Sequence, residues 1–152
     1  MKKILVPAAL IFAFSLSTNA QKVFKKLGDN EVSQSELRVA ISLSEKLMLG
    51  QKTGDIYILS EDEAIPQVAK GLTKDIQISS YESVSSMFGE YESMQFSEAW
   101  NTESDQIYTI YRFIGTFSKS TEKAEIRLVF NTETKLAGFF ILQWDDDFGG
   151  QP

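Results

Sequence analysis

The spacing of hydrophobic positions changes once along this 152-residue chain, at Gly89. Before that residue, apolar side chains recur every three or four positions, which indicates amphipathic helices. After it, apolar and polar residues alternate as far as Trp144, which indicates strands. Helices followed by a run of strands predict an α+β domain, with N-terminal helices packed on an antiparallel β-meander.

The first predicted helix follows Ser33 and Ser35, either of which can cap its first turn. We expect Gly50 and Gly54 to end it, because the helical spacing stops there. Its apolar stripe consists of Leu37, Ala40, Ile41, Leu43, Leu47 and Met48.

Two shorter helical segments are predicted before Gly89. Pro66 disfavours a helical residue before it, so the middle segment should be broken, with its second part from Pro66 to about Leu72. Thr73 or Asp75 opens the last helix, and Gly89 stands where a left-handed C-terminal cap is required.

Four strands are predicted after Gly89, at about residues 90–100, 106–117, 122–131 and 136–144. Their connections are short and polar, so consecutive strands should be antiparallel neighbours. In the third strand the even residues are apolar, and a turn that pairs Phe130 with Leu136 carries this face into the fourth strand. The predicted core face is therefore Met94, Phe96, Glu98, Trp100, Ala124, Ile126, Leu128, Phe130, Leu136, Gly138, Phe140, Leu142 and Trp144.

The second strand is apolar on both faces, which indicates that both faces of the sheet are covered. A second copy of the chain could cover the face opposite the predicted core through a two-fold interface, so a homodimer is predicted. The alternative cover is segment 21–34, through Val23, Phe24 and Leu27. The face in question consists of Ile107, Tyr111, Phe113, Phe117, Phe139 and Ile141.

Residues 1–20 have the pattern of a signal peptide, with two lysines, an apolar run and a small-x-small sequence before Gln21. The apolar run is shorter than the roughly 20 residues of a membrane span, although a single-pass anchor is the alternative. Gln21 stands where a lipid-modified protein would carry Cys. We therefore expect an exported protein, periplasmic or extracellular, that is not embedded in a membrane after cleavage. The rest divides into a loose lead-in at 21–34, a single α+β domain at 35–145 and an acidic, glycine-containing tail at 146–152.

Composition excludes several functional classes. Without the leader, 13 basic and 21 acidic residues give a net charge of −8, which argues against nucleic-acid binding. The chain has no His and no Cys, so Ser/His/Asp catalysis, Cys/His catalysis and the usual zinc sites are excluded. Carboxylate, Lys, Tyr or Ser chemistry remains, or no chemistry, and no cofactor is predicted.

The stretches FGEYESMQF, YRFIGTFSKS, KAEIRLVF and KLAGFFI follow the predicted helices. With those helices, they resemble small exported bacterial domains of unknown function in the nuclear transport factor 2-like (cystatin-like) superfamily, over about residues 35–145. The resemblance implies helices packed across a curved sheet in a cone with an apolar cavity, and homodimers through the sheet. Ketosteroid isomerase, an enzymatic member, uses a carboxylate base, but none of its motifs matches this chain residue by residue.

Glu98 is the candidate catalytic carboxylate, because parity places it between Phe96 and Trp100 on the predicted core face. In an apolar cavity its pKa would be raised, and it could act as an acid or base or orient a ligand. The alternative is that the strand ends, bulges or frays before Glu98, which then lies in water.

Arg112, Tyr108 and Trp100 complete the predicted ligand-binding set with Glu98. Arg112 could bind an anionic ligand or pair with an acid, or lie outside with its head in water. The expected register places Arg112 near Met94, so direct contact between Arg112 and Glu98 is not expected. No tyrosine is predicted to be catalytic, because aromatic residues at these spacings usually belong to a core.

The sequence WDDDFGG at residues 144–150 is predicted to be a solvated strand terminus rather than a metal site. Calcium loops alternate their acids with spacers, so that successive oxygens converge on one ion. Contiguous acids after a strand point to different sides instead.

Three functional hypotheses follow. We favour an exported, non-catalytic domain that binds a small apolar molecule or a partner protein. The second is a proton-transfer enzyme of isomerase or lyase type that uses a carboxylate in an apolar cavity. The third is an inhibitor-like or accessory protein that acts through a sheet face. A cavity lined by Glu98 and Arg112 would favour the enzyme, and a cavity filled by aromatic residues would favour either of the others.

Overall fold

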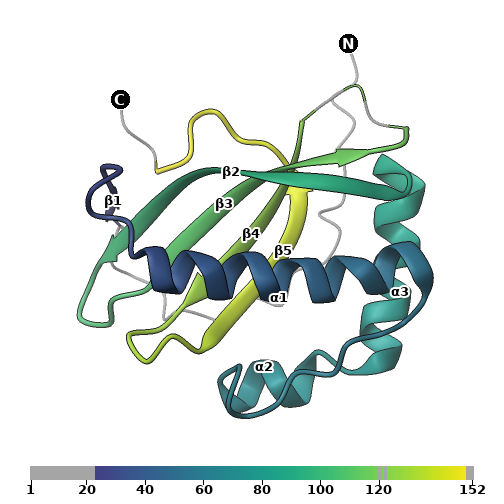
Figure 1. The fold of residues 1–152 in the computed structure, drawn as a ribbon, viewed down its shortest axis with the longest axis horizontal. Coiled ribbons are helices and arrows are strands. Elements are labelled where there is room, and N and C mark those ends of the chain that lie inside the picture. The colour runs from purple at the N-terminus through teal and green to yellow at the C-terminus, as the bar shows by residue number, and fades with distance from the viewer. Residues whose placement is uncertain (1–22, 120, 122, 150–152) are drawn as a thin grey trace.

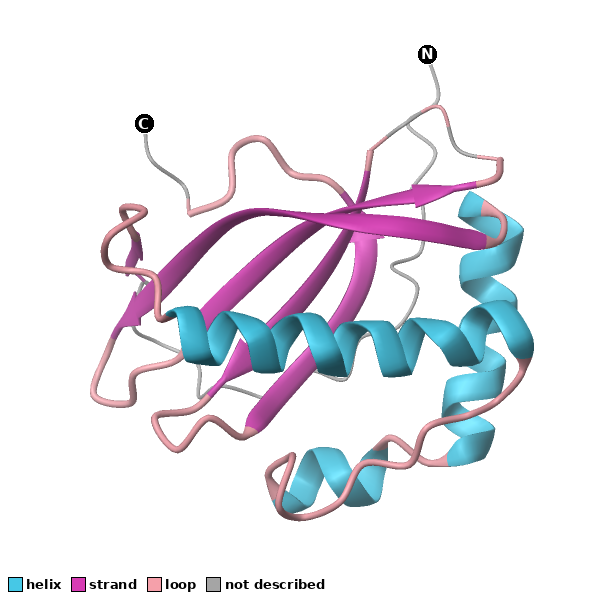
Figure 2. Cartoon of the chain, viewed as in Figure 1, coloured by secondary structure: helices cyan, strands magenta, loops and turns pink. Residues whose placement is uncertain are grey.

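The computed structural model describes residues 23–119, 121 and 123–149. Its helices are α1 (Gln34–Thr53), α2 (Pro66–Gly71) and α3 (Lys74–Phe88), and its strands are β1 (Val23–Lys26), β2 (Tyr91–Glu103), β3 (Thr109–Phe117), β4 (Ala124–Phe130) and β5 (Leu136–Gln143). The strands form one antiparallel sheet in chain order. The helices pack against this open, curved sheet, with α1 crossing it (Figure 1, Figure 2), so the predicted α+β class is confirmed. The predicted signal peptide lies outside the described residues.

Helices α1 and α3 begin at capping residues expected from the sequence, and α1 ends at the second of its two expected glycines. Ser33 caps α1 by accepting from the Glu36 amide, and Thr73 caps α3 in the same way through Ile76. Helix α1 continues through Gly50, where the backbone passes close to the Tyr81 ring, and ends at Gly54 with φ of 81°.

Gly89 ends α3 with a different geometry from the predicted left-handed cap. Its φ of 88° is positive but its ψ is −158°, which lies outside the left-handed helical region. This conformation brings the backbone against the β3–β4 connection, where an added Cβ would lie 2.4 Å from Ser118 Oγ. Only glycine fits both the torsion and the space.

The predicted loose lead-in forms part of the sheet. Val23–Lys26 is strand β1, which pairs with the far end of β2 from Val23 opposite Glu103 to Lys26 opposite Trp100. The sheet therefore has five strands where four were predicted, and β2 runs on to Glu103 to meet the added strand.

The pairing of the described strands shifts register at three bulges: one lies between Tyr91 and Ser93 at the start of β2, and the other two change the predicted core face. In β2, Phe96 pairs with Phe113 and Glu98 with Arg112, so Ser97 is an additional residue. In β5, Leu136 pairs with Phe130 and Gly138 with Val129, so Ala137 is an additional residue. Each bulge inverts the alternation for every residue that follows it in the strand.

The predicted core face is therefore right before the bulges at Ser97 and Ala137 and wrong after them. The even residues of β4, from Ala124 to Phe130, are buried against the helices, as is Leu136 of β5. Met94 and Phe96 of β2 pack against this core. Phe140 was expected in this core, but Phe139 and Ile141 take its place. Glu98 and Trp100 were also expected there, and Ala99 lies there instead.

The apolar face assigned to a homodimer is largely this same core. Tyr111, Phe113 and Phe117 of β3 lie under the helices with Phe139 and Ile141, whereas Ile107 is exposed. The face assignment was wrong, because β3 turns its odd residues to the helices. The homodimer prediction consequently loses the surface on which it was based.

Candidate functional site

The face of the sheet opposite the helices, here called the back face, carries a buried group of charges. Arg112 is 1% exposed and lies opposite Glu98 across β2 and β3. Its Nη1 donates to Glu98 Oε1 at 2.5 Å, and its Nε and Nη2 donate to the two carboxylate oxygens of Glu125 at 2.8 and 2.7 Å. Direct contact between Arg112 and Glu98 was not expected from the sequence, and the bulge at Ser97 produces it.

Two more cations complete this group. Arg127 stands directly opposite Arg112 across β3 and β4, and Glu125 separates the two like charges by accepting from both Nε groups. Lys26 of β1 lies 2.5 Å from the second carboxylate oxygen of Glu98. We call these five residues the ion cluster: Lys26, Glu98, Arg112, Glu125 and Arg127.

The segment after β5 covers the ion cluster. Arg112 Nη2 donates to the Asp145 carbonyl at 2.7 Å, and its guanidinium lies 4.0 Å from the centre of the Trp144 ring. The Phe148 ring lies 4.4 Å from the Arg112 guanidinium and 4.6 Å from that of Arg127. In Figure 1 this yellow segment runs back over the strands toward β1.

Two aromatic rings hold Phe148 in place. Trp100 meets it edge to face at a centroid distance of 5.3 Å, and Phe24 of β1 lies at 5.2 Å. Gly149 has φ of 90° and passes so close to Trp100 that an added Cβ would lie 2.8 Å from its ring. We call residues 144–149 the C-terminal clasp, because they connect the end of β5 to β1 and β2.

The side chains of Asp145, Asp146 and Asp147 are exposed, as expected of a solvated strand terminus. Asp146 accepts from Trp144 Nε1, and the Asp145 carboxylate accepts from the Asp147 amide. Within the described residues, no three acidic side chains are grouped as metal ligands. The clasp is therefore positioned by its aromatic rings and its backbone, while its acids face water.

The surroundings of the two glutamates keep them ionised. Burial alone would raise the pKa of Glu98, but hydrogen bonds from Lys26 and Arg112 outweigh burial and hold the pKa below its ordinary value. The pKa of Glu125 is likewise lowered, because Arg112 and Arg127 together outweigh its burial. Both groups are fixed anions rather than acids or bases that titrate near neutral pH.

Three of the four predicted ligand-binding residues come together on the back face. Glu98 and Arg112 are paired, and Trp100 supports the clasp beside them. Tyr108 is buried, and its amide donates to Thr102 Oγ1, but its side chain has no recorded contact with the ion cluster. Glu125, Arg127 and Phe148 belong to the group and were missed. Alternation in β4 placed Glu125 and Arg127 together on the outer face, but their register with Arg112 was not available from the sequence.

A second candidate site lies on the helix side, where two shallow depressions meet at Lys46. One of about 420 Å³ lies between α1 and the Asp62–Glu63 turn, and one of about 610 Å³ lies between α1 and residues 54–58. We call their combined lining the α1 groove. It consists of Arg38, Val39, Ser42, Leu43, Lys46, Leu49, Gly54, Asp55, Ile56, Tyr57, Ile58, Asp62, Glu63, Lys74 and Thr134.

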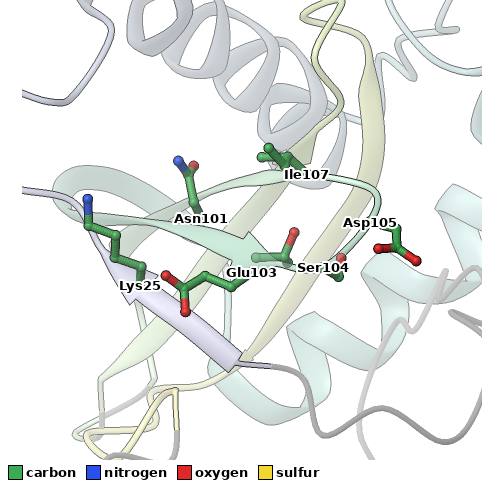
Figure 3. Close-up of a pocket in the computed structure, with 7 residues that line it drawn as sticks. Lys25, Asn101, Glu103, Ser104, Asp105 and Ile107 are labelled. Carbon is green, nitrogen blue, oxygen red and sulfur yellow. The ribbon is translucent and has the colours of Figure 1, made fainter.

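A third depression, of about 470 Å³, lies at the β2–β3 turn (Figure 3). Glu103 points toward Lys25 there, whereas Asp105 points away on the far side of the turn. Lys25 is engaged by Glu31 at 2.8 Å. The polar groups do not converge on one point, so this depression does not form a binding site of its own.

Comparison with known proteins gave no match to any family model, curated sequence or solved structure. Over the described ranges, the structure contains no helix with the length and apolar character needed to cross a membrane.

Proposed function

We propose that this chain is an exported, non-catalytic binding domain that recognises a partner protein through the α1 groove. The signal-peptide pattern of residues 1–20 supports export. We also propose membership of the nuclear transport factor 2-like superfamily, with which three helices on a five-stranded antiparallel sheet are compatible.

The state of Glu98 is the observation that carries the non-catalytic assignment. A general acid or base needs a pKa near the working pH and a free oxygen that can reach the substrate. Glu98 has a lowered pKa, and its two oxygens are held by Arg112 and Lys26. It also lies on the face of the sheet away from the helices, so the cavity that an enzyme of this kind would use does not contain it.

Exposed apolar residues favour the α1 groove as the recognition surface. Seven large hydrophobic residues are exposed among those that the structure describes, and three of them line this groove. Two of the three, Leu49 and Ile58, are 49% and 56% exposed. Such side chains, when gathered in one region, commonly mark an interaction site. The groove is open and shallow, which suits a segment of another protein better than an enclosed small molecule.

The charges of the groove indicate the chemistry of the partner. Arg38 and Lys74 line its two depressions and form no ion pair with any described residue, although the chain carries a net charge of −6. Of the three lining acids, Glu63 accepts from Tyr57 and Ser60, Asp55 accepts from Thr53, and Asp62 forms no ion pair with any described residue. A partner segment with apolar residues, and with carboxylates placed to reach Arg38 and Lys74, would complement these two unpaired cations.

Two synthetic peptides test this proposal. Both are amphipathic helices with the same leucines, and their polar positions are Glu in one and Lys in the other. We expect the Glu peptide to shift the backbone amide NMR signals of Val39, Leu49 and Ile58, and the Lys peptide to bind at least tenfold more weakly. The double variant Leu49→Asp, Ile58→Asp should lose at least tenfold in affinity for the Glu peptide.

Ile107→Asp is the matched control, because Ile107 is 49% exposed, as is Leu49, but lies at the β2–β3 turn. It should bind the Glu peptide as the unmodified chain does. Equal binding of the two peptides, or an equal loss in Ile107→Asp, would show that the α1 groove is not the recognition surface.

A further inference from the structure

The two edge strands of the sheet differ in how they are protected from other strands. β1 is four residues long and contains Lys25 and Lys26, and short, lysine-bearing edges resist pairing with another chain. β5 has the sequence LAGFFILQ, without a charged residue or a proline. An apolar edge of this length pairs readily unless another segment covers it.

Leu136, the first residue of β5, is bonded on its outer side to the segment that precedes α2. The Leu136 amide donates to the Glu63 carbonyl, and the Leu136 carbonyl accepts from the Ile65 amide. The rest of β5 runs from Ala137 to Gln143. This bridge fixes where an added strand would have to begin.

The backbone of Phe139 and Ile141 points away from β4. The Trp144 amide donates to the Lys123 carbonyl, so alternation turns Leu142 and Phe140 toward β4 and turns Ile141 and Phe139 outward. Neither Phe139 nor Ile141 has a recorded hydrogen bond outside the β4–β5 pairing. Their two N–H and two C=O groups form an open ladder.

We propose that this edge pairs with β5 of a second copy, antiparallel and about a two-fold axis at Phe140. The position of the axis follows from the open ladder, because Phe140 lies midway between Phe139 and Ile141. Phe139 of each copy then pairs with Ile141 of the other copy. These two pairs give four hydrogen bonds between the copies. The two sheets become one sheet of ten strands.

A second copy suits this edge better than an unrelated strand for two reasons. The chain carries a net charge of −6, yet two copies would meet here along strands without charge, so like charges do not face each other. The axis also brings Phe140 against its own copy on the back face, where each ring is only partly buried in a single chain. An aromatic pair across a non-hydrogen-bonded position stabilises such pairing.

Cysteine cross-linking tests this proposal cleanly, because the chain contains no Cys. In the purified protein, Phe140→Cys places two thiols at the two-fold axis, with Cα atoms about 4.5 Å apart, within the range of a disulfide. We expect mild oxidation at micromolar concentration to convert most of this variant into a covalent dimer. Leu142→Cys is the control: it lies on the same face of the same strand but opposite Gly138 of the other copy, so it should stay monomeric.

A second variant separates pairing from folding. Phe140→Lys would place two like charges on the axis and should weaken association at least tenfold in sedimentation, while circular dichroism shows an unchanged fold. Equal cross-linking of the two cysteine variants, or sedimentation of the unmodified protein as a monomer across the micromolar range, would overturn the proposal. Neither result bears on the α1 groove, which lies on the helix side.

Discussion

The helix side and the back face of the sheet are both buried, but by different means. On the helix side, apolar side chains from α1 and α3 meet those of the strands, and aromatic rings such as Phe88 and Phe117 lie 5.6 Å apart. On the back face, Arg112 and Glu125 are at most 1% exposed, and the cover over Arg112 is the C-terminal clasp. One sheet thus supports an apolar layer and an ionic one.

The two layers should respond differently to substitution. An apolar layer loses stability in proportion to the volume removed, because each side chain contributes many small contacts. A buried ionic layer loses most when one partner is removed, because the remaining charge is left without compensation. The stability of the back face therefore depends on every member of the ion cluster being present. The stability of the helix side depends on the volume that its apolar side chains fill.

The largest expected effect lies in the helix-side layer. Phe139→Ala should lower the free energy of unfolding by about 3–5 kcal/mol, because Phe139 is 1% exposed within the core. Phe140→Ala is the matched control on the other face, and should lower it by about 1 kcal/mol. Denaturant unfolding of both variants measures the difference, and the reverse order would show that β5 has no bulge at Ala137.

Glu125→Gln should have the next largest effect. It preserves the size of the side chain but leaves the buried Arg112 with only Glu98 as a charged partner, and should lower the free energy of unfolding by about 3 kcal/mol at neutral pH. Glu133→Gln, at an exposed position in the β4–β5 turn, should change it by less than about 0.5 kcal/mol.

The effect of Glu125→Gln should also depend on pH. The folded state lowers the pKa of Glu125, so its carboxylate stabilises the fold at pH values above its pKa in the unfolded chain. That contribution is lost as the pH falls through the lowered pKa of the folded state. The difference between the unmodified protein and Glu125→Gln should therefore shrink in acid, and a constant difference would show that Glu125 is not an ion-paired carboxylate.

The smallest expected effect concerns the C-terminal clasp. Phe148→Ala removes the ring that lies against both guanidiniums and Trp100, and should lower the free energy of unfolding by about 1–2 kcal/mol. It should also make Trp100 fluorescence more accessible to acrylamide. Asp147→Ala changes an exposed side chain of the same segment and should do neither. If the two variants behave alike, the clasp does not cover the back face.

Local patterns were sufficient for most of the fold. Helical spacing and capping residues such as Ser33 and Thr73 act within a few positions, and the helices they predicted are present. Alternation identified the core face of β4 for the same reason. A bulge is a property of two strands together, so the additional residues Ser97 and Ala137 left no sign in the alternation, and Glu98 and Phe140 were placed on the wrong face.

The candidate site was only partly accessible to the same reasoning. Glu98 and Arg112 were selected because alternation placed each charged side chain on the same strand face as apolar residues. Their contact with each other depends on the bulge, and their contacts with Glu125 and Phe148 depend on strand register and on the return of the chain end across the sheet. Segment 21–34 was assigned no strand, because four residues with two lysines show no clear alternation.

The pKa of the Glu98 carboxyl group distinguishes an ion-paired residue on the back face from a catalytic base in a cavity. Side-chain carboxyl ¹³C NMR signals, assigned with a Glu98→Gln variant, can be followed from pH 7 into acid. In the structure, Lys26 and Arg112 hold both oxygens, so Glu98 should titrate below the ordinary value of 4.5. A midpoint above that value would place Glu98 in an apolar environment without its cations, and would contradict both the ion cluster and the non-catalytic function proposed from it.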